Sequence, residues 1–265
     1  MPKRFIVTGC NGYIGSHMCY ELKQAYPDCH ITGVDKVEKQ HLRSLYDIFI
    51  RADLAVDTFS LPEADATFHF AAYISVEEGE RKPFEYFFNN VVGSYRCCYE
   101  SIKAGIPNFI FSSTAAVYGE SKSQMFGHLM ETQPMNAFSV YGKSKQMVEE
   151  MLAKVTETKV ICLRYFNASG RNKAAGLHEE HDPETHLIPL LAQNKTATIY
   201  GDNWPTKDGT CIRDYVHVID VCRAHLLAYK YMDSMKTMPV NMSLNVGSGK
   251  GYSVKEVVDK ANEIL

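Results

Sequence analysis

The stretch Arg4-Phe5-Ile6-Val7-Thr8-Gly9-Cys10-Asn11-Gly12-Tyr13-Ile14-Gly15 joins a strand-like apolar run to a Gly-x-x-Gly-x-x-Gly loop. A helix-like pattern follows from Gly15 to Lys23. Glycines permit a tight turn and let the backbone approach a phosphate, while the start of a helix presents free N–H groups and the positive end of its dipole. The stretch therefore predicts the strand–loop–helix unit that holds the pyrophosphate of a dinucleotide.

The second strand-like run, from His30 to Asp35, ends on a carboxylate twenty residues beyond Gly15. A carboxylate there can accept both ribose hydroxyls of NAD and repels a 2′-phosphate, so NAD is favoured over NADP, although Lys36 can neutralise part of that repulsion. The alternative is an ordinary glycine-rich turn beside a solvated aspartate. The first part of the predicted cofactor site consists of Gly9, Asn11, Gly12, Tyr13, Ile14, Gly15 and Asp35.

Strand-like and helix-like segments alternate along the first 169 residues, which predicts an α/β fold with a doubly wound parallel sheet of the Rossmann type. The further strands are expected at 66–70, 108–112 and 159–165, and the further helices at 85–104 and 141–154. From Gly170 the pattern loosens into a polar segment. We therefore expect an NAD-binding domain over residues 1–169 and a smaller, apparently incomplete substrate-binding region over residues 170–265, some of whose elements return to the first domain.

Composition excludes several classes of function. The 265 residues carry a formal net charge of −3, which provides no basic field for nucleic acid or anionic lipid. The chain has no apolar run near the roughly 18 residues of a membrane span, and its start lacks the pattern of a signal peptide. The eight cysteines include no Cys-x-x-Cys pair and no metal-ligand spacing. We expect a cytoplasmic protein with reduced thiols and no metal, nucleic-acid or membrane partner.

Tyr141 and Lys145 lie four residues apart in a helix-like segment and so share one face of the predicted helix. An ammonium near a tyrosine, together with the positive charge of nicotinamide, favours the phenolate that acts as a general base. Taken alone, the pair would more often be a solvated one; behind a dinucleotide loop the catalytic interpretation is favoured. Residues 112–114, Ser-Ser-Thr, add hydroxyls at the carboxyl end of a strand, where open α/β sheets bind their ligands.

Together these motifs resemble the extended short-chain dehydrogenases, and most closely the UDP-glucose 4-epimerase family, over nearly the whole chain. Other segments of the resemblance occur in the family's order: Asp53-Leu54, His69-Phe70-Ala71-Ala72, Asn89-Asn90-Val91, Leu163-Arg164-Tyr165-Phe166-Asn167, and Tyr200-Gly201-Asp202-Asn203-Trp204-Pro205 followed by Arg213-Asp214-Tyr215-Val216-His217. The last of these looks like the substrate-domain signature of the epimerases.

The resemblance implies a role for each matching residue. Thr114 would hydrogen-bond the sugar O4, Tyr141 would be the base, and Lys145 would tune it. Asn167 and Arg213 would hold the phosphates of a UDP-sugar. The segment with His186 and Leu187 would lie near the substrate, where His186 could contact uridine; an unrelated surface histidine is the equal alternative. The remaining cofactor contacts implied are Asp53, Leu54, Phe70, Ala71, Ala72, Asn90, Ser112, Tyr141, Lys145 and Tyr165.

The implied reaction is NAD-dependent epimerisation at C4 of a UDP-sugar, most simply UDP-glucose and UDP-galactose. A dehydratase of similar fold would need an acid/base pair after Thr114, where this chain has Ala115 and Ala116. The alternative from another class is a non-catalytic binder of NAD or a nucleotide sugar. It is motivated by a C-terminal region shorter than is usual for these epimerases.

The resemblance also implies a possible homodimer. The segments 95–99 and 147–152 match helices that form a four-helix interface in the family. Simple burial of these helices against the sheet is the alternative explanation.

Overall fold

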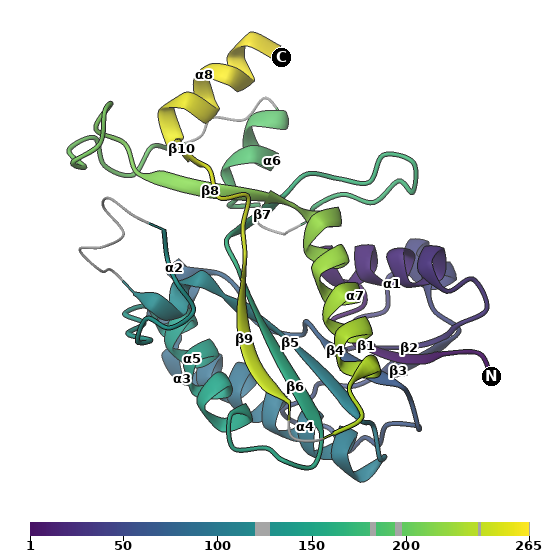
Figure 1. Ribbon diagram of the computed structural model, residues 1–265. Helices are drawn as coiled ribbons and strands as arrows, with labels where there is room; N and C mark the ends of the chain where they lie inside the picture. The colour runs from purple at the N-terminus through teal and green to yellow at the C-terminus, as the bar shows by residue number, and fades with distance from the viewer. Residues whose placement is uncertain (120–127, 181–183, 194–197, 238–239, 265) are drawn as a thin grey trace.

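The computed structural model describes residues 1–119, 128–180, 184–193, 198–237 and 240–264 (Figure 1). The strands are β1 (Arg4–Thr8), β2 (His30–Asp35), β3 (Ile48–Arg51), β4 (Ala66–His69), β5 (Asn108–Thr114), β6 (Lys159–Tyr165), β7 (Asn167–Ser169), β8 (Ile212–His217), β9 (Asn241–Val246) and β10 (Gly251–Ser253). The helices are α1 (Tyr13–Ala25), α2 (Val76–Arg81), α3 (Pro83–Phe87), α4 (Gly93–Lys103), α5 (Val140–Leu152), α6 (Leu187–Ala192), α7 (Val218–Ser234) and α8 (Val254–Ile264).

A seven-stranded sheet forms the body of the protein, in the order β3-β2-β1-β4-β5-β6-β9. Every neighbouring pair in this sheet is parallel. The chain therefore reverses its direction of winding between β1 and β4, which is the point where doubly wound sheets bind dinucleotides. The predicted Rossmann-type α/β fold is confirmed.

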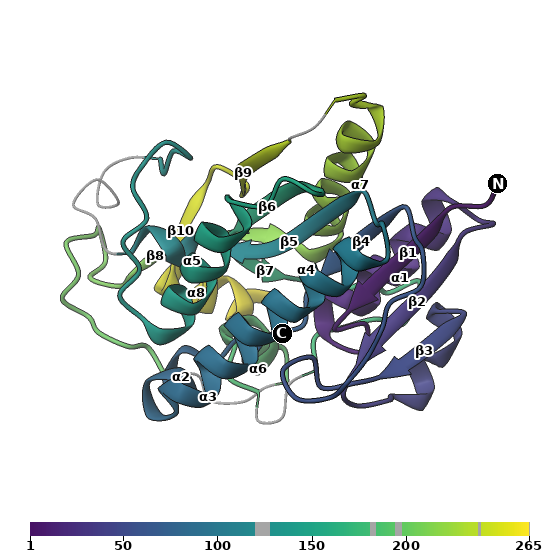
Figure 2. The ribbon, with the colours of Figure 1, turned by 90° about the horizontal axis from the view of Figure 1, so that it is seen from below.

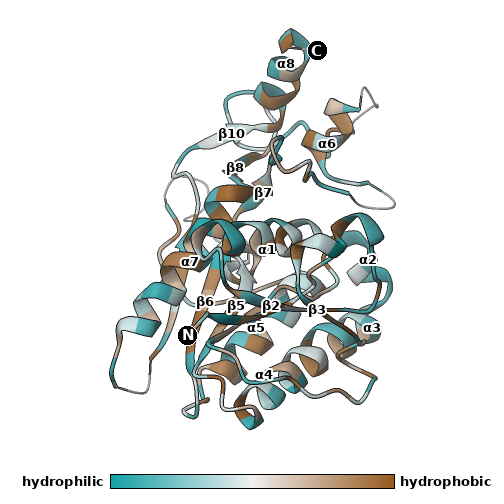
Figure 3. Cartoon of the chain, turned by 90° about the vertical axis from the view of Figure 1, so that its right-hand side faces the viewer, coloured by the Kyte–Doolittle hydropathy of each residue, from teal (hydrophilic) through white to brown (hydrophobic). Residues whose placement is uncertain are grey.

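Helices cover both faces of the large sheet (Figure 3). Side chains alternate along β1, so that Phe5 and Val7 pack toward α1 and α7 while Ile6 packs toward the other face. In β5, Phe109 and Phe111 belong to that second core, together with residues of α4 and α5. The central strands therefore bury apolar side chains on both faces, which explains the hydrophobic runs of the sequence.

A second, three-stranded sheet in the order β10-β8-β7 lies beyond the carboxyl ends of the large sheet, with α6 and α8 beside it (Figure 1). The two sheets are joined by short covalent links: only Phe166 separates β6 from β7, and β8 runs directly into α7. β9 lies against β6, and α7 packs on α1, so α7 and β9 return to the large sheet. Residues 167–169, by contrast, belong to the small sheet.

Several element boundaries differ from the sequence prediction. The segment 85–104, predicted as one helix, consists of α3, a π-helical turn over Phe88–Val92, and α4. β3, β7, β8, β10 and α2 were not predicted, because they are only three to six residues long and offer little periodicity. Within the described part of the chain, no helix is long and apolar enough to cross a membrane.

Candidate active site

The glycine loop forms a tight turn between β1 and α1. The Gly9 N–H donates to the Val34 carbonyl over 2.8 Å, and the Gly12 N–H donates to the Gly9 carbonyl over 2.9 Å. Gly9 has a φ of +68°, a conformation that favours glycine. A Cβ on Gly15 would lie 2.0 Å from the Gly9 carbonyl oxygen, so the turn closes only because residue 15 has no side chain.

The start of α1 fits the pyrophosphate of a dinucleotide. Gly12 caps the helix without a side-chain hydrogen bond, and the first turn contains no acidic residue. The first N–H groups of a 13-residue helix therefore point out of its end, where they and the helix dipole attract an anion. Lys39 and Glu180 form an ion pair of 3.2 Å beside this loop, and the Tyr13 hydroxyl donates to the Gly170 carbonyl over 2.7 Å. Gly170 and Glu180, in the region predicted to bind substrate, thus reach the glycine loop.

Asp35 ends β2 next to this loop, as predicted. Its carboxylate accepts hydrogen bonds from the backbone N–H groups of Asn11, at 3.0 Å, and Val37, at 3.3 Å. Burial raises the pKa of Asp35. The fixed carboxylate retains lone pairs for ribose hydroxyls and so suits NAD. Lys36 is directed elsewhere: its Nζ donates to the Tyr73 hydroxyl over 3.0 Å.

Asp53 and Leu54 occupy the turn that follows β3. The Asp53 carboxylate accepts the Ala55 N–H over 3.0 Å, and Leu54 is buried. Phe70, Ala71 and Ala72 follow β4 directly, at the same edge of the sheet. These residues therefore follow the carboxyl ends of β4, which pairs with β1, and of β3, which lies on the far side of β2, although in sequence they are far from the glycine loop.

The predicted catalytic residues meet where β5 contacts α5. Thr114, the last residue of β5, hydrogen-bonds the Tyr141 side chain. The Lys145 Nζ donates to the Ser112 carbonyl over 2.8 Å and lies 4.8 Å from the centre of the Phe111 ring. The structure thus brings together the hydroxyl donor, the tyrosine and the lysine that sequence reasoning selected.

Burial changes the acid–base properties of this pair. It lowers the pKa of Lys145 to about 7, against which the charge of Glu149 acts. Burial also raises the pKa of Tyr141 to about 12, although the hydrogen bond from Thr114 lowers it. The expectation of a favoured phenolate is therefore not met by these residues alone, because burial outweighs the stabilisation that Thr114 gives.

Tyr165, Ser112 and Asn90 surround the catalytic residues. The hydroxyl groups of Tyr165 and Ser112 form a hydrogen bond at the adjoining ends of β6 and β5. The Asn90 amide accepts the Tyr73 N–H over 2.8 Å and donates to the Tyr73 carbonyl and to the Ser144 hydroxyl, each over 3.0 Å. Asn90 therefore fixes α5 between Tyr141 and Lys145, a contact that its predicted role as a cofactor residue did not include.

Asn167 and Arg213 lie on the small sheet. Asn167 opposes Tyr215 in the β7–β8 pair, and side chains two residues apart on a strand share a face, so Asn167 and Arg213 point to one side of that sheet. Arg213 is exposed, and its guanidinium donates to the Ile212 carbonyl over 3.1 Å. The neighbouring Asp214 instead accepts hydrogen bonds from the N–H groups of Ser248 and Gly249. The Asp214 carboxylate is therefore bound to the turn at 248–249. An ion pair between Asp214 and Arg213 would have explained Arg213 without a ligand, but these contacts do not form one.

His186 precedes α6, and Leu187 is its first residue. The His186 Nδ1 lies 2.7 Å from a Glu179 carboxylate oxygen and 3.6 Å from one of Glu184. The hydrogen bond to Glu179 raises the pKa of His186. One ligand atom from each of these three side chains lies within 4.8 Å of the others, a spacing that a metal ion can occupy. The charge-assisted hydrogen bond between His186 and Glu179 explains why these side chains lie together, so the cluster does not require a metal ion.

Comparisons with known proteins agree with this arrangement. The profile of the NAD dependent epimerase/dehydratase family matches residues 5–247. The chain belongs to this family. It is 36% identical to the UDP-glucose 4-epimerase of Halalkalibacterium halodurans over 98% of this chain and 79% of that relative.

Solved structures of the same kind superpose closely on this epimerase-family chain. One is a UDP-glucose 4-epimerase from Stenotrophomonas maltophila with bound NAD and formylated UDP-arabinopyranose, at a TM-score of 0.84 and 31% identity over 97% of this chain and 81% of that one. Another is a UDP-glucose 4-epimerase from Brucella ovis in complex with NAD, at a TM-score of 0.84 and 32% identity over the same shares of the two chains.

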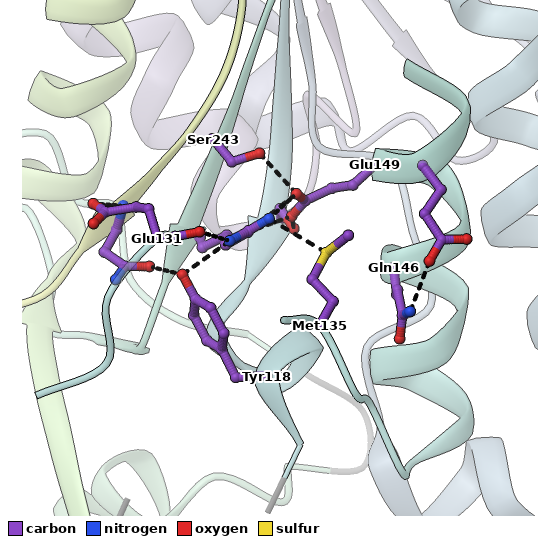
Figure 4. A network of polar contacts seen from close by, with 10 residues as sticks. Tyr118, Glu131, Met135, Gln146, Glu149 and Ser243 are labelled. Carbon is purple, nitrogen blue, oxygen red and sulfur yellow. Dashed lines mark hydrogen bonds and ion pairs between the residues drawn. The ribbon is translucent and has the colours of Figure 1, made fainter. Parts of the chain in front are cut away.

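Sequence reasoning missed a buried ion pair beneath the active site of this family member (Figure 4). The Arg164 Nη2 lies 2.7 Å from a Glu149 carboxylate oxygen, and both side chains are almost fully buried. Burial disfavours the cation, but hydrogen bonds to Glu149 and Tyr118 raise the pKa of Arg164. The signal in the sequence was a glutamate four residues after Lys145 on the buried face of α5, and an arginine inside an apolar strand.

Proposed function

We propose that this protein is an NAD-dependent 4-epimerase of a UDP-sugar, most simply UDP-glucose and UDP-galactose. The contact of Thr114 with Tyr141, one helical turn before Lys145, is the observation that carries the proposal. The relatives that it resembles are named UDP-glucose 4-epimerases. We assign cofactor binding to residues 1–169 and binding of the sugar nucleotide mainly to residues 170–265.

Tyr141 and Thr114 carry out the proton chemistry in this proposal. Thr114 holds the sugar O4 against the Tyr141 oxygen, which takes the O4 proton as the C4–H bond breaks and returns a proton when that bond re-forms on the other face. Bound NAD supplies the reversible two-electron oxidation at C4. Lys145 lowers the free energy of the Tyr141 phenolate when its own amine is protonated. Asn167 and Arg213 hold the diphosphate, and Arg213 suits it because a guanidinium can donate two parallel hydrogen bonds.

The residues after Thr114 favour epimerisation over dehydration. Ala115 and Ala116 begin a short 3-10 turn, and the Ala116 N–H donates to the Thr114 hydroxyl over 3.1 Å. Eliminating water from a sugar needs a side chain that moves a second proton, and a methyl group cannot do so.

The second candidate is a non-catalytic binder of NAD or a nucleotide sugar. It is favoured by the pKa of Tyr141, about 12, because the tyrosine then stays protonated unless a positive charge acts on it.

Proton NMR of the protein with UDP-galactose and NAD tests the function directly through the anomeric signals of the sugar. We expect the signals of UDP-glucose to grow until the two sugars reach equilibrium. An NAD-binding preparation that leaves UDP-galactose unchanged would favour the non-catalytic candidate or another UDP-sugar. A matched assay with UDP-N-acetylgalactosamine separates these two outcomes.

Substitution of Tyr141 by Phe removes only the oxygen that carries the proton. We expect kcat to fall on the order of 10² to 10⁴-fold, the usual contribution of a general acid–base group, with NAD affinity and thermal stability close to wild type. The matched control is Tyr231→Phe, which removes a hydroxyl from a partly exposed tyrosine of α7 and should keep the wild-type kcat. Full epimerase activity in Tyr141→Phe would contradict the proposed mechanism.

We further propose a cytoplasmic homodimer. Tyr95 and Tyr99 stack on the outer surface of α4 with ring centres 6.1 Å apart, and each is at least half exposed. Met147 on the adjacent α5 is also exposed. Aromatic side chains that gather on an outer helical surface are typical of an interface.

The eight cysteines are free thiols, and reduced thiols are typical of the cytoplasm.

A further inference from the structure

Three consecutive residues of β5 contact three residues of α5 that lie one helical turn apart. Thr114 hydrogen-bonds Tyr141, the Ser112 carbonyl accepts from Lys145, and the Ser113 hydroxyl donates to the Glu149 carboxylate. Positions 141, 145 and 149 follow one face of the helix. Glu149 therefore makes the third contact of the row that aligns the catalytic tyrosine and lysine with their strand.

The Glu149 carboxylate is also fixed from two other strands. Arg164 on β6 donates to both of its oxygens, from Nε at 3.0 and 3.1 Å and from Nη2 at 2.7 Å. Ser243 on β9 donates to the same carboxylate over 2.8 Å (Figure 4). Arg164 is itself held by the Tyr118 hydroxyl at 2.9 Å. The hydrogen bonds of this network offset the desolvation of the buried charges, whereas removing one partner leaves an uncompensated charge.

We propose that Glu149 is a positioning residue for the catalytic pair: it sets the register of α5 on β5 and, through its negative charge, favours the protonated form of the buried Lys145. The function of Lys145 rests on the proposed epimerase activity, but the contacts and the charge of Glu149 do not. Glu149 lies one helical turn from Lys145, on the side opposite Tyr141.

The other titratable groups around Lys145 do not supply this negative charge. Burial lowers the pKa of His69 on β4 to about 3 and raises the pKa of the Cys162 thiol on β6, so both are neutral near pH 7. Burial likewise raises the pKa of Tyr165 and Tyr141. Arg164 is a cation, paired with Glu149. A Cys162 thiolate would also favour the ammonium form of Lys145, but near pH 7 this thiol is neutral, so among these groups Glu149 supplies the negative charge.

NMR titration of ¹³Cε-labelled lysine tests the charge without turnover. The signal of Lys145 is identified by its loss in Lys145→Met, and we expect a midpoint near pH 7 in the wild type. In Glu149→Gln the midpoint should fall by about one to two pH units, as for a unit charge about 6 Å away at an effective dielectric constant of about 20. The control is Glu150→Gln, the same substitution at the exposed neighbour, which should keep the wild-type midpoint. An unchanged midpoint in folded Glu149→Gln would overturn the proposal.

A second variant covers the case in which Glu149→Gln does not fold because the Arg164 cation is left alone. The double substitution Glu149→Gln with Arg164→Gln removes both charges, and the titration of Lys145 is repeated in it. Because loss of the Arg164 cation itself raises the midpoint, the reference is Arg164→Gln alone, and we expect a lower midpoint in the double variant than in that reference. A midpoint at or above that of Arg164→Gln would overturn the proposal.

A matched pair of serine variants tests the register. Ser113→Ala and Ser243→Ala each remove one hydroxyl that donates to Glu149, the first from the catalytic strand and the second from β9. We expect kcat to fall at least about tenfold in Ser113→Ala with KM little changed, since small misplacements of catalytic groups are costly. Ser243→Ala should lose less than half of its kcat. Equal losses of kcat in the two variants would refute a role of Glu149 in the register of α5. If the wild type itself shows no turnover, the proposed function is refuted, and the titration of Lys145 then tests the role of Glu149.

Discussion

Lys145 is a cation that the fold places in an apolar setting, against the Phe111 ring and almost without exposure to solvent. One carbonyl, that of Ser112, receives its hydrogen bond. Burial of a charge without full compensation favours the neutral form, which explains why the pKa of Lys145 falls to about 7. A lysine that titrates near neutral pH can change the charge next to Tyr141 over the physiological range.

The lowered pKa of Lys145 also makes the free energy of unfolding depend on pH. Between about pH 7 and 10.5 the folded lysine has released a proton that the unfolded chain still binds, so the free energy of unfolding rises with pH in this range. The stabilisation is complete above the unfolded pKa and is lost as the pH falls toward 7. Lys145→Met has no amine to titrate, so its free energy of unfolding lacks this rise. Relative to wild type, we therefore expect the stability of Lys145→Met to decrease by up to about 2.7 kcal/mol between about pH 7 and pH 9.

Urea unfolding at the two pH values measures this difference. Lys143→Met, an exposed lysine on the same helix, is the matched control and should follow the wild-type pH dependence. If the stability of Lys145→Met also follows the wild-type pH dependence, the pKa of the Lys145 amine is not lowered in the folded protein, and burial does not determine its charge.

At the residue scale, local motifs were sufficient to select Tyr141, Lys145 and Asp35 as candidates, and the family resemblance added Thr114, which the fold places next to Tyr141. The partners of Asn90 and Glu149 could not be predicted in this way. Asn90 joins residue 73 to residue 144, and Glu149 joins three strands, so their contacts depend on the packing of separate elements. Burial, which reverses the expected titration of Tyr141, is likewise a property of the assembled site.

Among the elements, the glycine loop depends most closely on backbone geometry. A Cβ at position 15 would lie 2.0 Å from the Gly9 carbonyl oxygen, a backbone atom that can move only if the turn itself opens. We expect Gly15→Ala to lower NAD affinity at least about tenfold, equivalent to about 1.4 kcal/mol, and to destabilise the fold. Calorimetric titration with NAD and chemical denaturation measure the two effects.

Gly93→Ala is the control for that substitution. Gly93 has helical backbone angles at the start of α4, and an added Cβ would make only ordinary contacts, the nearest at 3.5 Å from the Leu54 Cβ. Alanine should stabilise this helix by about 0.5 to 1 kcal/mol without a loss of NAD affinity. Similar losses of affinity in both variants would show that the glycine loop has no special geometric requirement.

The strands and helices of the large sheet were predictable because most of them are long and strongly patterned. The short elements were not: β7 and β10 have three residues each, and their pairing with β8 joins segments more than 35 residues apart. The π-helical turn at Phe88–Val92 was also missed, since an extra residue in one turn does not disturb the helical periodicity enough to be recognised.

On the scale of the whole molecule, the chain leaves the large sheet after β6 and returns to it with α7 and β9 (Figure 2). The Lys159 Nζ stabilises this return by donating to the carbonyls of Met232 and Met235, at 2.7 and 2.6 Å, where α7 ends. The small sheet is thereby tied to the large sheet on both sides. Its arrangement depends on long-range pairing, which is why the sequence indicated a change near Gly170 and a return of later elements to the first domain, but not the small sheet between them.

The outer surface of α4 and α5 leads to the prediction at this scale. If two copies associate through it, the wild type should sediment at about twice the mass of one 29.9 kDa chain. Tyr95→Glu places a charge on a residue that is 53% exposed in one chain and would be buried between two, so we expect the dimer to dissociate to the single-chain mass. Tyr231→Glu, on α7 and 44% exposed, makes the same change outside this surface and should leave the dimer intact. A wild type that sediments as a single chain, or a Tyr95→Glu variant that remains a dimer, would place the association elsewhere or exclude it, and the exposed aromatics of α4 would then need another partner.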